Sequence, residues 1–280
     1  MNVPELTAEE IQARVLHRDG LMLVIDKPAG LPVHRGPKGG ANLESSFDAL
    51  RFGLPRPPVL AHRLDKDTSG CLVLGRHRKA TASLGLLFKH GRIGKTYWAV
   101  VEGGPADDEG TIDLALGRLN VERGWWQKPD PDGQQAITHW KVLGRSNGTT
   151  WLAMEPVTGR THQLRVHAAA QGWPIVGDNI YGSGPRFGEP RLHLHSREIV
   201  IPISKNKEPV RVTAPTPEHM HERLRTCGWN GEQVATQIEP SSSAHADDPV
   251  FQKTLVIRLH CRGVLDTPHS RGMTTVPERR

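Results

Sequence analysis

Residues 62–74 read His-Arg-Leu-Asp-Lys-Asp-Thr-Ser-Gly-Cys-Leu-Val-Leu, a polar run followed by an apolar one. The Asp-Thr-Ser-Gly segment at 67–70 consists of residue types that favour turns, and the apolar residues after it read as a buried strand. Asp65 therefore stands beside Arg63 and just before a turn that leads into a strand. A carboxylate held in this way next to a fixed cation can act as a nucleophile or as an electrostatic stabiliser.

The same residues also suit a turn without any chemistry. Asp65, Asp67 and Gly70 are common turn residues, so on their own they favour this structural interpretation. Only the wider sequence context reverses that preference.

A second stretch, residues 159–181, reads Gly-Arg-Thr-His-Gln-Leu-Arg-Val-His-Ala-Ala-Ala-Gln-Gly-Trp-Pro-Ile-Val-Gly-Asp-Asn-Ile-Tyr. Together the two stretches resemble the signature of the RluA-type pseudouridine synthases, enzymes that isomerise uridine in RNA. Further segments match the same family in the same order: Lys-Pro-Ala-Gly-Leu-Pro-Val-His at 27–34, Lys-Thr-Tyr-Trp-Ala-Val at 95–100, Gln-Ala-Ile-Thr at 135–138 and Leu-His-Leu-His at 192–195. The resemblance covers roughly residues 18–215.

The order of the predicted elements indicates the α+β class, with a mostly antiparallel mixed sheet as the core and helices flanking it. Many strands alternate irregularly with few helices; strands are expected at 21–25, 70–74, 97–101, 111–114, 136–143, 150–155 and 192–201, and helices after Thr7, over 42–50, 79–89 and 161–170, and after Thr216. The resemblance implies a catalytic domain of the pseudouridine synthase type.

Three regions are expected along the chain. Residues 1–17 form a short N-terminal helix or extension, 18–230 the catalytic domain, and 231–280 a disordered or loosely packed tail in which 255–259 is the one apolar island. Many family members carry a small RNA-binding domain ahead of the catalytic one. Residues 1–17 are too few for it, so we expect the catalytic domain itself to dock the substrate.

Composition narrows the class of protein. A formal net charge of +6 over 280 residues suits a polyanionic partner. No apolar run approaches the ~20 residues of a membrane helix, and a secretory signal pattern is missing at the start. Three distant cysteines without Cys-x-x-Cys spacing support neither a disulfide framework nor a zinc site. Composition therefore fits an intracellular protein without a membrane segment. The resemblance implies that the polyanionic partner is structured RNA and that no metal or cofactor is needed, and we expect a cytoplasmic monomer.

The resemblance implies three catalytic residues. Asp65 matches the family's indispensable acid, whereas the family pattern tolerates other residues at Asp67. A carboxyl group in a dry pocket gains a proton unless a cation keeps it ionised, and Arg165, on the predicted helix, suits that role because its guanidinium is permanently charged. Tyr97 matches the family's pocket aromatic, with a core aromatic as the alternative; its ring would stack on uracil, and its hydroxyl would help remove the proton from the base carbon.

Further residues are candidates for substrate binding. Arg63 resembles the arginine that fills the gap left by an extruded base, and His62 would steady its loop. Four polar residues of the matching segments, Arg160, His162, Gln163 and Lys27, and the loop residue His34 complete the set. For the loop cations, solvation at the surface is the alternative. Trp125 and Trp126, flanked by cations, form either a stacking platform for RNA or a packed loop anchor.

Two other functions compete with that of a synthase. The runner-up is a catalytically inactive RNA-binding protein or RNA chaperone on the same scaffold, which would not need Asp65, Tyr97 and Arg165 together. A metal-dependent RNA hydrolase would need a pair of carboxylates at its metal site, and the sequence shows no such pair. His193 and His195 alternate on a predicted strand but have no further ligand at suitable spacing, so we expect them, like Asp178, to belong to the scaffold.

Overall fold

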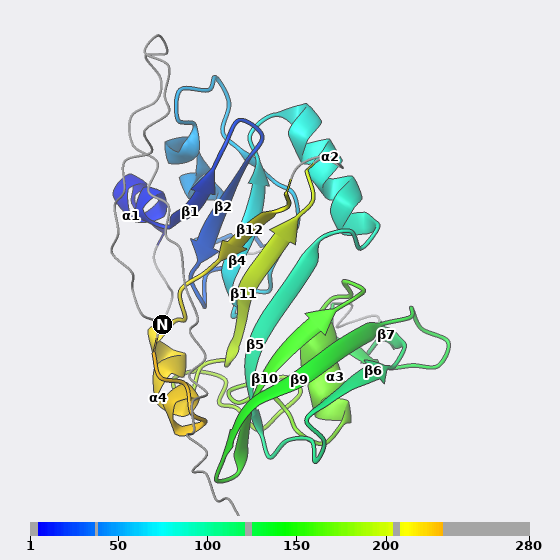
Figure 1. Ribbon diagram of the computed structural model, residues 1–280. Coiled ribbons are helices and arrows are strands. Elements are labelled where there is room, and N and C mark those ends of the chain that lie inside the picture. The colour runs from blue at the N-terminus through cyan, green and yellow to red at the C-terminus, as the bar shows by residue number, and fades with distance from the viewer. Residues whose placement is uncertain (1–4, 37–38, 121–124, 204–207, 232–280) are drawn as a thin grey trace, which may run out of the picture.

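A ten-stranded sheet forms the centre of the molecule in the computed structural model, which describes residues 5–36, 39–120, 125–203 and 208–231. Its strands follow the order β1-β2-β4-β11-β5-β10-β9-β6 (Figure 1). In addition, β3 pairs with β4, and β12 pairs with β11. Within the described ranges only β4 and β11 run parallel; the other pairs of this sheet are antiparallel. The predicted α+β class with a mostly antiparallel sheet is confirmed.

The elements have the following bounds. The strands of the large sheet are β1 (Val15–Arg18), β2 (Met22–Lys27), β3 (Val59–Leu60), β4 (Ser69–Gly75), β5 (Gly94–Glu102), β6 (Glu109–Asp113), β9 (Ile137–Ser146), β10 (Thr149–Pro156), β11 (Leu194–Ile201) and β12 (Val210–Thr213). A separate hairpin pairs β7 (Leu116–Arg118) with β8 (Gln127–Pro129). The helices are α1 (Ala8–Ala13), the 3-10 helix η1 (Glu44–Leu50), α2 (Arg78–Lys89), α3 (Gln163–Ala170) and α4 (Glu218–Thr226).

Strand β4 shows how the opening stretch of sequence builds the centre of the sheet. All seven of its residues are buried, as the apolar run predicts, because β2 and β11 flank it on both sides. Gly70 adopts φ +102°, and a Cβ there would lie 2.2 Å from the carbonyl oxygen of Ser196 on β11. Only glycine fits this close approach without strain, so the turn that carries Asp65 is anchored against the neighbouring strand.

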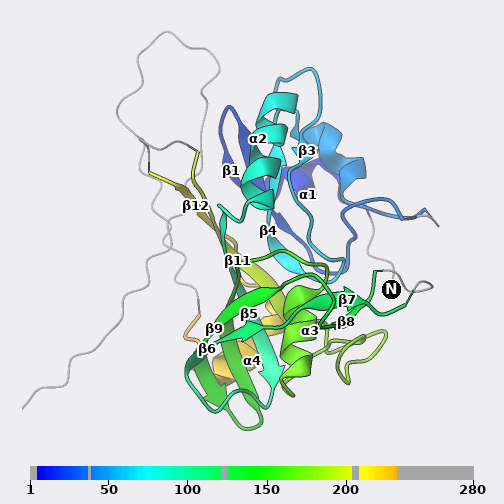
Figure 2. The same cartoon turned by 90° about the vertical axis from the view of Figure 1, so that its right-hand side faces the viewer.

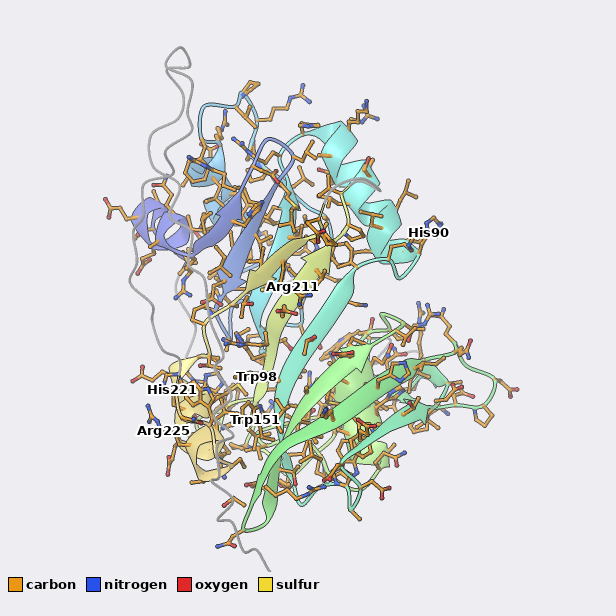
Figure 3. The ribbon with its side chains drawn as sticks, viewed as in Figure 1. His90, Trp98, Trp151, Arg211, His221 and Arg225 are labelled. Atoms are coloured by element: carbon orange, nitrogen blue, oxygen red, sulfur yellow. The ribbon has the colours of Figure 1, made fainter. Side chains whose placement is uncertain are left out.

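Helices α3 and α4 cover opposite faces of the sheet. Ala99 of β5 packs in the cluster that includes Leu164 of α3, whereas the next residue, Val100, packs with Leu224 of α4. Successive strand residues point to opposite faces, so the two helices sandwich β5 (Figure 2). On the α4 side, Trp98 meets Trp151 edge-on at 4.7 Å (Figure 3), which agrees with the packing role that Trp98 has by alternation from Tyr97.

Some expected elements differ from the structure. Residues 44–50 form a 3-10 helix rather than an α-helix. The helix expected from residue 161 begins at Gln163, because His162 has a left-handed backbone with φ 54°. The strand expected over 192–201 begins at Leu194 and lies in the middle of the sheet. The boundary expected after residue 17 falls inside β1, which already pairs with β2. The expected tail lies outside the described residues beyond residue 231.

Buried His195 predicts that acid destabilises the fold. Its Nδ1 accepts the hydrogen bond of the Ser69 hydroxyl at 2.9 Å, and its Nε2 donates to the Ala214 carbonyl. Burial lowers the pKa of His195 from 6.5 to about 3, so the neutral ring stabilises the fold fully above pH 6.5. That contribution falls as the pH drops toward 3, by about 3 kcal/mol at pH 4.

Urea unfolding at pH 7.5 and pH 4 measures this effect, with His195→Gln as the comparison. The variant should be less stable at pH 7.5, but its stability should fall less on acidification than that of the wild type. Equal losses in both proteins would show that His195 does not contribute to the acid sensitivity.

Candidate active site

A cavity of about 370 Å³ collects most of the predicted site residues. Its walls come from the turn before β4, the end of α2, strand β5 and the start of α3. Eight of the ten predicted residues line it: Asp65, Tyr97, Arg165, His62, Arg63, Arg160, His162 and Gln163. The structure therefore brings together residues from three segments that are far apart in the sequence.

The carboxylate of Asp65 faces two basic groups without being hydrogen-bonded to either. Its Oδ2 lies 3.9 Å from Nη1 of Arg165 and 3.7 Å from Nε2 of His162. Both distances exceed a hydrogen bond, and the Asp65 side chain is 20% exposed toward the cavity. The acid is therefore near a counter-ion and still open to a ligand.

The guanidinium of Arg165 is oriented by a buried acid, Asp178. Arg165 donates from Nε and Nη2 to the two carboxylate oxygens of Asp178 at 2.8 and 2.7 Å, and the two side chains are 3% and 0% exposed. Burial alone raises the pKa of Asp178, but the hydrogen bond and charge of Arg165 outweigh it and lower the pKa. A bidentate pair of this kind fixes a planar fork, and it leaves Nη1 facing Asp65.

Asp178 was expected to be scaffold, and its part in holding Arg165 was missed. The sequence offers only a weak indication of this role: Asp178 is the one acidic residue in the stretch 159–181, thirteen residues after Arg165. Its Oδ1 also accepts the backbone N–H groups of Ile180 and Tyr181, so the loop after α3 is closed around this carboxylate.

His162 is set in place by Tyr181, a second residue that was missed. The backbone N–H of Gln127 donates to the Tyr181 hydroxyl at 2.9 Å, which leaves the hydroxyl proton for Nδ1 of His162 at 2.8 Å. This assignment puts the imidazole proton on Nε2, the atom that faces Asp65. Because burial lowers the pKa of His162, the ring is a neutral donor and Arg165 is the cation beside the acid.

Gln163 lines the cavity but serves as a structural residue, contrary to expectation. Its Oε1 accepts hydrogen bonds from the Thr158 hydroxyl and the Arg160 N–H, and its Nε2 donates to Ile137 and Thr138. With the amide satisfied inside the protein and the residue 3% exposed, Gln163 joins the start of α3 to β9. Its side chain has no group left for a substrate.

Tyr97 lies on β5 between two clusters of the core and lines the cavity. Burial raises the pKa of its phenol, and the nearby charge of Asp65 adds to that effect. The residue is therefore a neutral phenol whose ring offers a flat surface to a ligand. The expected roles of Tyr97, stacking of its ring on uracil and proton removal by its hydroxyl, both stay predictions.

His62 steadies the turn before β4 from inside the cavity wall. Its Nε2 accepts the backbone N–H of Val73 at 3.0 Å, and its ring stacks on Phe88 at 4.1 Å. Burial lowers the pKa of His62 to about 3, so the ring is neutral. Arg63 beside it is exposed, as is Arg160, whose Nε donates to the Gln135 carbonyl. These two arginines bring positive charge to the cavity.

Lys27 and His34 do not line the cavity. The structure contradicts the expected role of Lys27 as a ligand of substrate, whereas the role expected of the exposed His34 stays a prediction. Lys27 is 0% exposed, and its Nζ donates to the carbonyls of Pro28, Lys66 and Thr68, each at 2.8 Å. His34 pairs with Glu44 at 2.7 Å. The sequence shows a cation in a loop but not its direction; at the end of β2, Lys27 turns inward onto the turn that holds Asp65.

Removal of the Lys27 ammonium is expected to destabilise the turn around Asp65. Lys27→Met leaves three carbonyl groups without their donor, which should lower the free energy of unfolding by about 3 kcal/mol or more. Urea unfolding measures this. Lys66→Met is the matched control, because Lys66 is an exposed lysine of the same turn and should change stability by less than about 0.5 kcal/mol. Similar values for both variants would contradict the role of Lys27.

Trp125 stands at the edge of this group of residues. It is 55% exposed and meets the His162 ring edge-on at 5.4 Å, and it contacts Trp126 in the same way. Trp125 is thus partly packed against other rings and partly exposed, so both expected roles, a stacking platform for RNA and a loop anchor, stay predictions. The loop residues 121–124 before it lie outside the described ranges.

Neither a metal centre nor a membrane helix is present in the described residues. No group of three His, Cys, Asp or Glu side chains there is arranged to hold a metal ion. In the same part of the chain, none of the helices has the length and apolar character needed to cross a membrane.

Comparison with known proteins agrees with the geometry. Residues 21–170 match the family model described as RNA pseudouridylate synthase. The chain belongs to this family. An uncharacterized RNA pseudouridine synthase of Zymomonas mobilis is 45% identical over 207 residues, which cover 73% of this chain and 94% of that one. The ribosomal large subunit pseudouridine synthase D of Xanthomonas campestris is 36% identical over 234 residues, covering 76% and 68%.

The fold of the synthase is also found in a solved structure. Human RNA pseudouridylate synthase domain containing 4 superposes with a TM-score of 0.65 at 27% identity and covers 78% of this chain and 95% of its own. The protein is thus an isomerase that converts uridine to pseudouridine in RNA, as the resemblance of the two sequence stretches implied.

Proposed function

We propose that this synthase isomerises a flipped-out uridine of a structured ribosomal or transfer RNA, with the carboxylate of Asp65 as the catalytic group. The observation that carries the proposal is the placement of Asp65: an open carboxylate in a 370 Å³ cavity, 3.9 Å from the buried Arg165. The reaction breaks the bond between N1 of uracil and C1′ of the ribose, turns the base and joins C5 to C1′. C5 then loses its proton and N1 takes one up, so the product is an isomer of the substrate. It needs a carboxylate close to the sugar and base.

The neighbours of Asp65 divide the remaining tasks. Arg165 places a positive charge 3.9 Å from the carboxylate of Asp65. The ring of Tyr97 holds the uracil by stacking, an interaction worth about 1–3 kcal/mol per base. The Nε2–H of His162 supplies a neutral donor beside the reacting groups. Because no electrons are transferred, the reaction asks for no redox cofactor, and we propose that the synthase works without a cofactor or metal.

Extrusion of the base explains the arginines at the cavity. A uridine inside a helix is out of reach until it leaves its stack. Arg63, exposed and two residues before Asp65, is placed to occupy the vacated position, and Arg160 to contact the backbone of the distorted strand. The net charge of +6 favours such a polyanionic substrate.

The RNA target is open to a direct test. The Xanthomonas relative is named for the large ribosomal subunit, which favours ribosomal RNA, with transfer RNA as the alternative. Carbodiimide primer extension on both RNA classes, from cells with and without the gene, should reveal at least one pseudouridine that depends on the gene. The purified protein should restore it in vitro. Identical maps from the two strains would contradict the proposal.

The working form that we propose is a cytoplasmic monomer in which catalysis is carried by the domain expected over residues 18–230, with the rest of β1 (Val15–Arg18) included. Its sedimentation should correspond to one chain of 30.9 kDa, and its activity should survive treatment with a chelator. A dimer in sedimentation, or inactivation by the chelator, would correct these two points without affecting the role of Asp65.

A further inference from the structure

Lys95 is a cation of the cavity for which the catalytic arrangement above has no use. It lies on β5 two residues before Tyr97, so both side chains are on the same face of the strand, about 7 Å apart along it. Both line the cavity. Lys95 is also close enough to the buried His62 ring for its charge, after burial, to lower the pKa of His62.

The ammonium of Lys95 has no partner within the described part of the chain. It makes no ion pair and no side-chain hydrogen bond there, although the residue is half-buried. Burial lowers its pKa, and no neighbouring carboxylate opposes that shift. A half-buried charge without a partner is unfavourable. Lys27 shows the usual solution, because its ammonium is satisfied by three carbonyls.

The surroundings of Lys95 favour an anionic ligand. Arg63, Lys89 and Arg160 also line the cavity, so one part of its wall is basic while Asp65 provides the acid. In an RNA substrate the uracil is neutral, and the formal charge is on the phosphodiester groups. The spacing between Lys95 and Tyr97 is similar to the span from the base to the phosphate of one nucleotide.

We propose that Lys95 binds a backbone phosphate next to the target uridine while Tyr97 contacts its base. This inference rests on the proposed function of the same cavity. In this arrangement Lys95 sets the position of the extruded nucleotide along β5. Its charge is expected to act on one phosphate and not on the RNA as a whole.

The test combines variants of Lys95 with substrates that lack one charge. The stem-loop that contains the target uridine is prepared with normal phosphates, or with a neutral methylphosphonate on the 5′ or on the 3′ side of that uridine. Wild type, Lys95→Met and Lys95→Arg are compared by kcat/KM. Lys141→Met is the matched control, since Lys141 is an exposed lysine of β9 that does not line the cavity.

On the normal RNA, Lys95→Met should lower kcat/KM by about 10- to 100-fold, because a hydrogen bond to a charged group is lost. On one of the two methylphosphonate RNAs, wild type and Lys95→Met should differ by less than about 3-fold. In Lys95→Met, the slope of the logarithm of the RNA-binding constant against the logarithm of the salt concentration should become smaller by about 1. Lys95→Arg should keep most of the activity, and Lys141→Met all of it.

Two results would overturn the proposal: full activity of Lys95→Met, or the same loss on all three RNAs, which would point to a contact with the base or to a structural role. Circular dichroism checks the fold, and Lys95→Gln replaces the methionine variant if that one is unfolded. A wild type that is inactive on every RNA would instead count against the proposed function, so the two failures can be told apart.

Discussion

The Asp65→Asn protein is expected to stay folded and to bind RNA, yet to lose about 10⁴-fold or more of its pseudouridine formation. Asparagine has the size of aspartate but neither its charge nor its nucleophilic oxygen. The fold should tolerate the change, because Oδ2 of Asp65 is 3.7 Å or more from its two basic neighbours. The one turn contact of Asp65, to Thr68 N–H, uses its backbone carbonyl.

Tritium release from RNA labelled at C5 of uridine measures this loss, and a gel-shift titration measures RNA binding. Asp67→Asn is the control, because Asp67 belongs to the same turn but does not line the cavity; it should keep most of the activity. If Asp65→Asn turned over at the wild-type rate, another group would have to be the catalytic acid.

The second large effect concerns the buried pair of Arg165 and Asp178. Asp178→Ala leaves the guanidinium of Arg165 buried without its partner, which should lower the free energy of unfolding by about 3–5 kcal/mol. It should also abolish activity, because the group that faces Asp65 is no longer oriented. Urea unfolding and tritium release measure the two effects.

A double variant separates stability from catalysis. In Arg165→Met/Asp178→Leu both charges are replaced by apolar groups, so much of the lost stability should return while activity stays absent. Arg165→Lys tests whether the planar guanidinium is needed, since a lysine keeps the charge but cannot make both hydrogen bonds to Asp178. Recovery of activity in the double variant, or a loss of stability below about 1 kcal/mol in Asp178→Ala, would contradict the role assigned to the pair.

Local chemistry was readable along the chain. The capping box of Thr7 and Glu10 is present at the start of α1, and the apolar run after Gly70 is the buried strand β4. The helix expected over 79–89 is α2, which ends before Gly91 at φ 63°. These features depend on residues within a few positions of one another, so turn types and periodicity report them well.

The partners of buried polar side chains were not readable in the same way. Lys27 looked like a loop cation, Asp178 and Tyr181 looked like scaffold, and Gln163 looked like a ligand of substrate. What each one does depends on a group elsewhere in the chain: Lys27 on the carbonyls of 66 and 68, Gln163 on β9, and Tyr181 on Gln127.

The sequence by itself therefore determined the family and the class of fold, and it predicted Asp65 as the catalytic residue, because motif order and periodicity are properties of the linear chain. Only the tertiary structure decided which side chains face the cavity and which ones hold it together. Whether a cation meets solvent or a buried carbonyl is set by how distant segments pack, since the burial of a charge is stable only where its partners meet it.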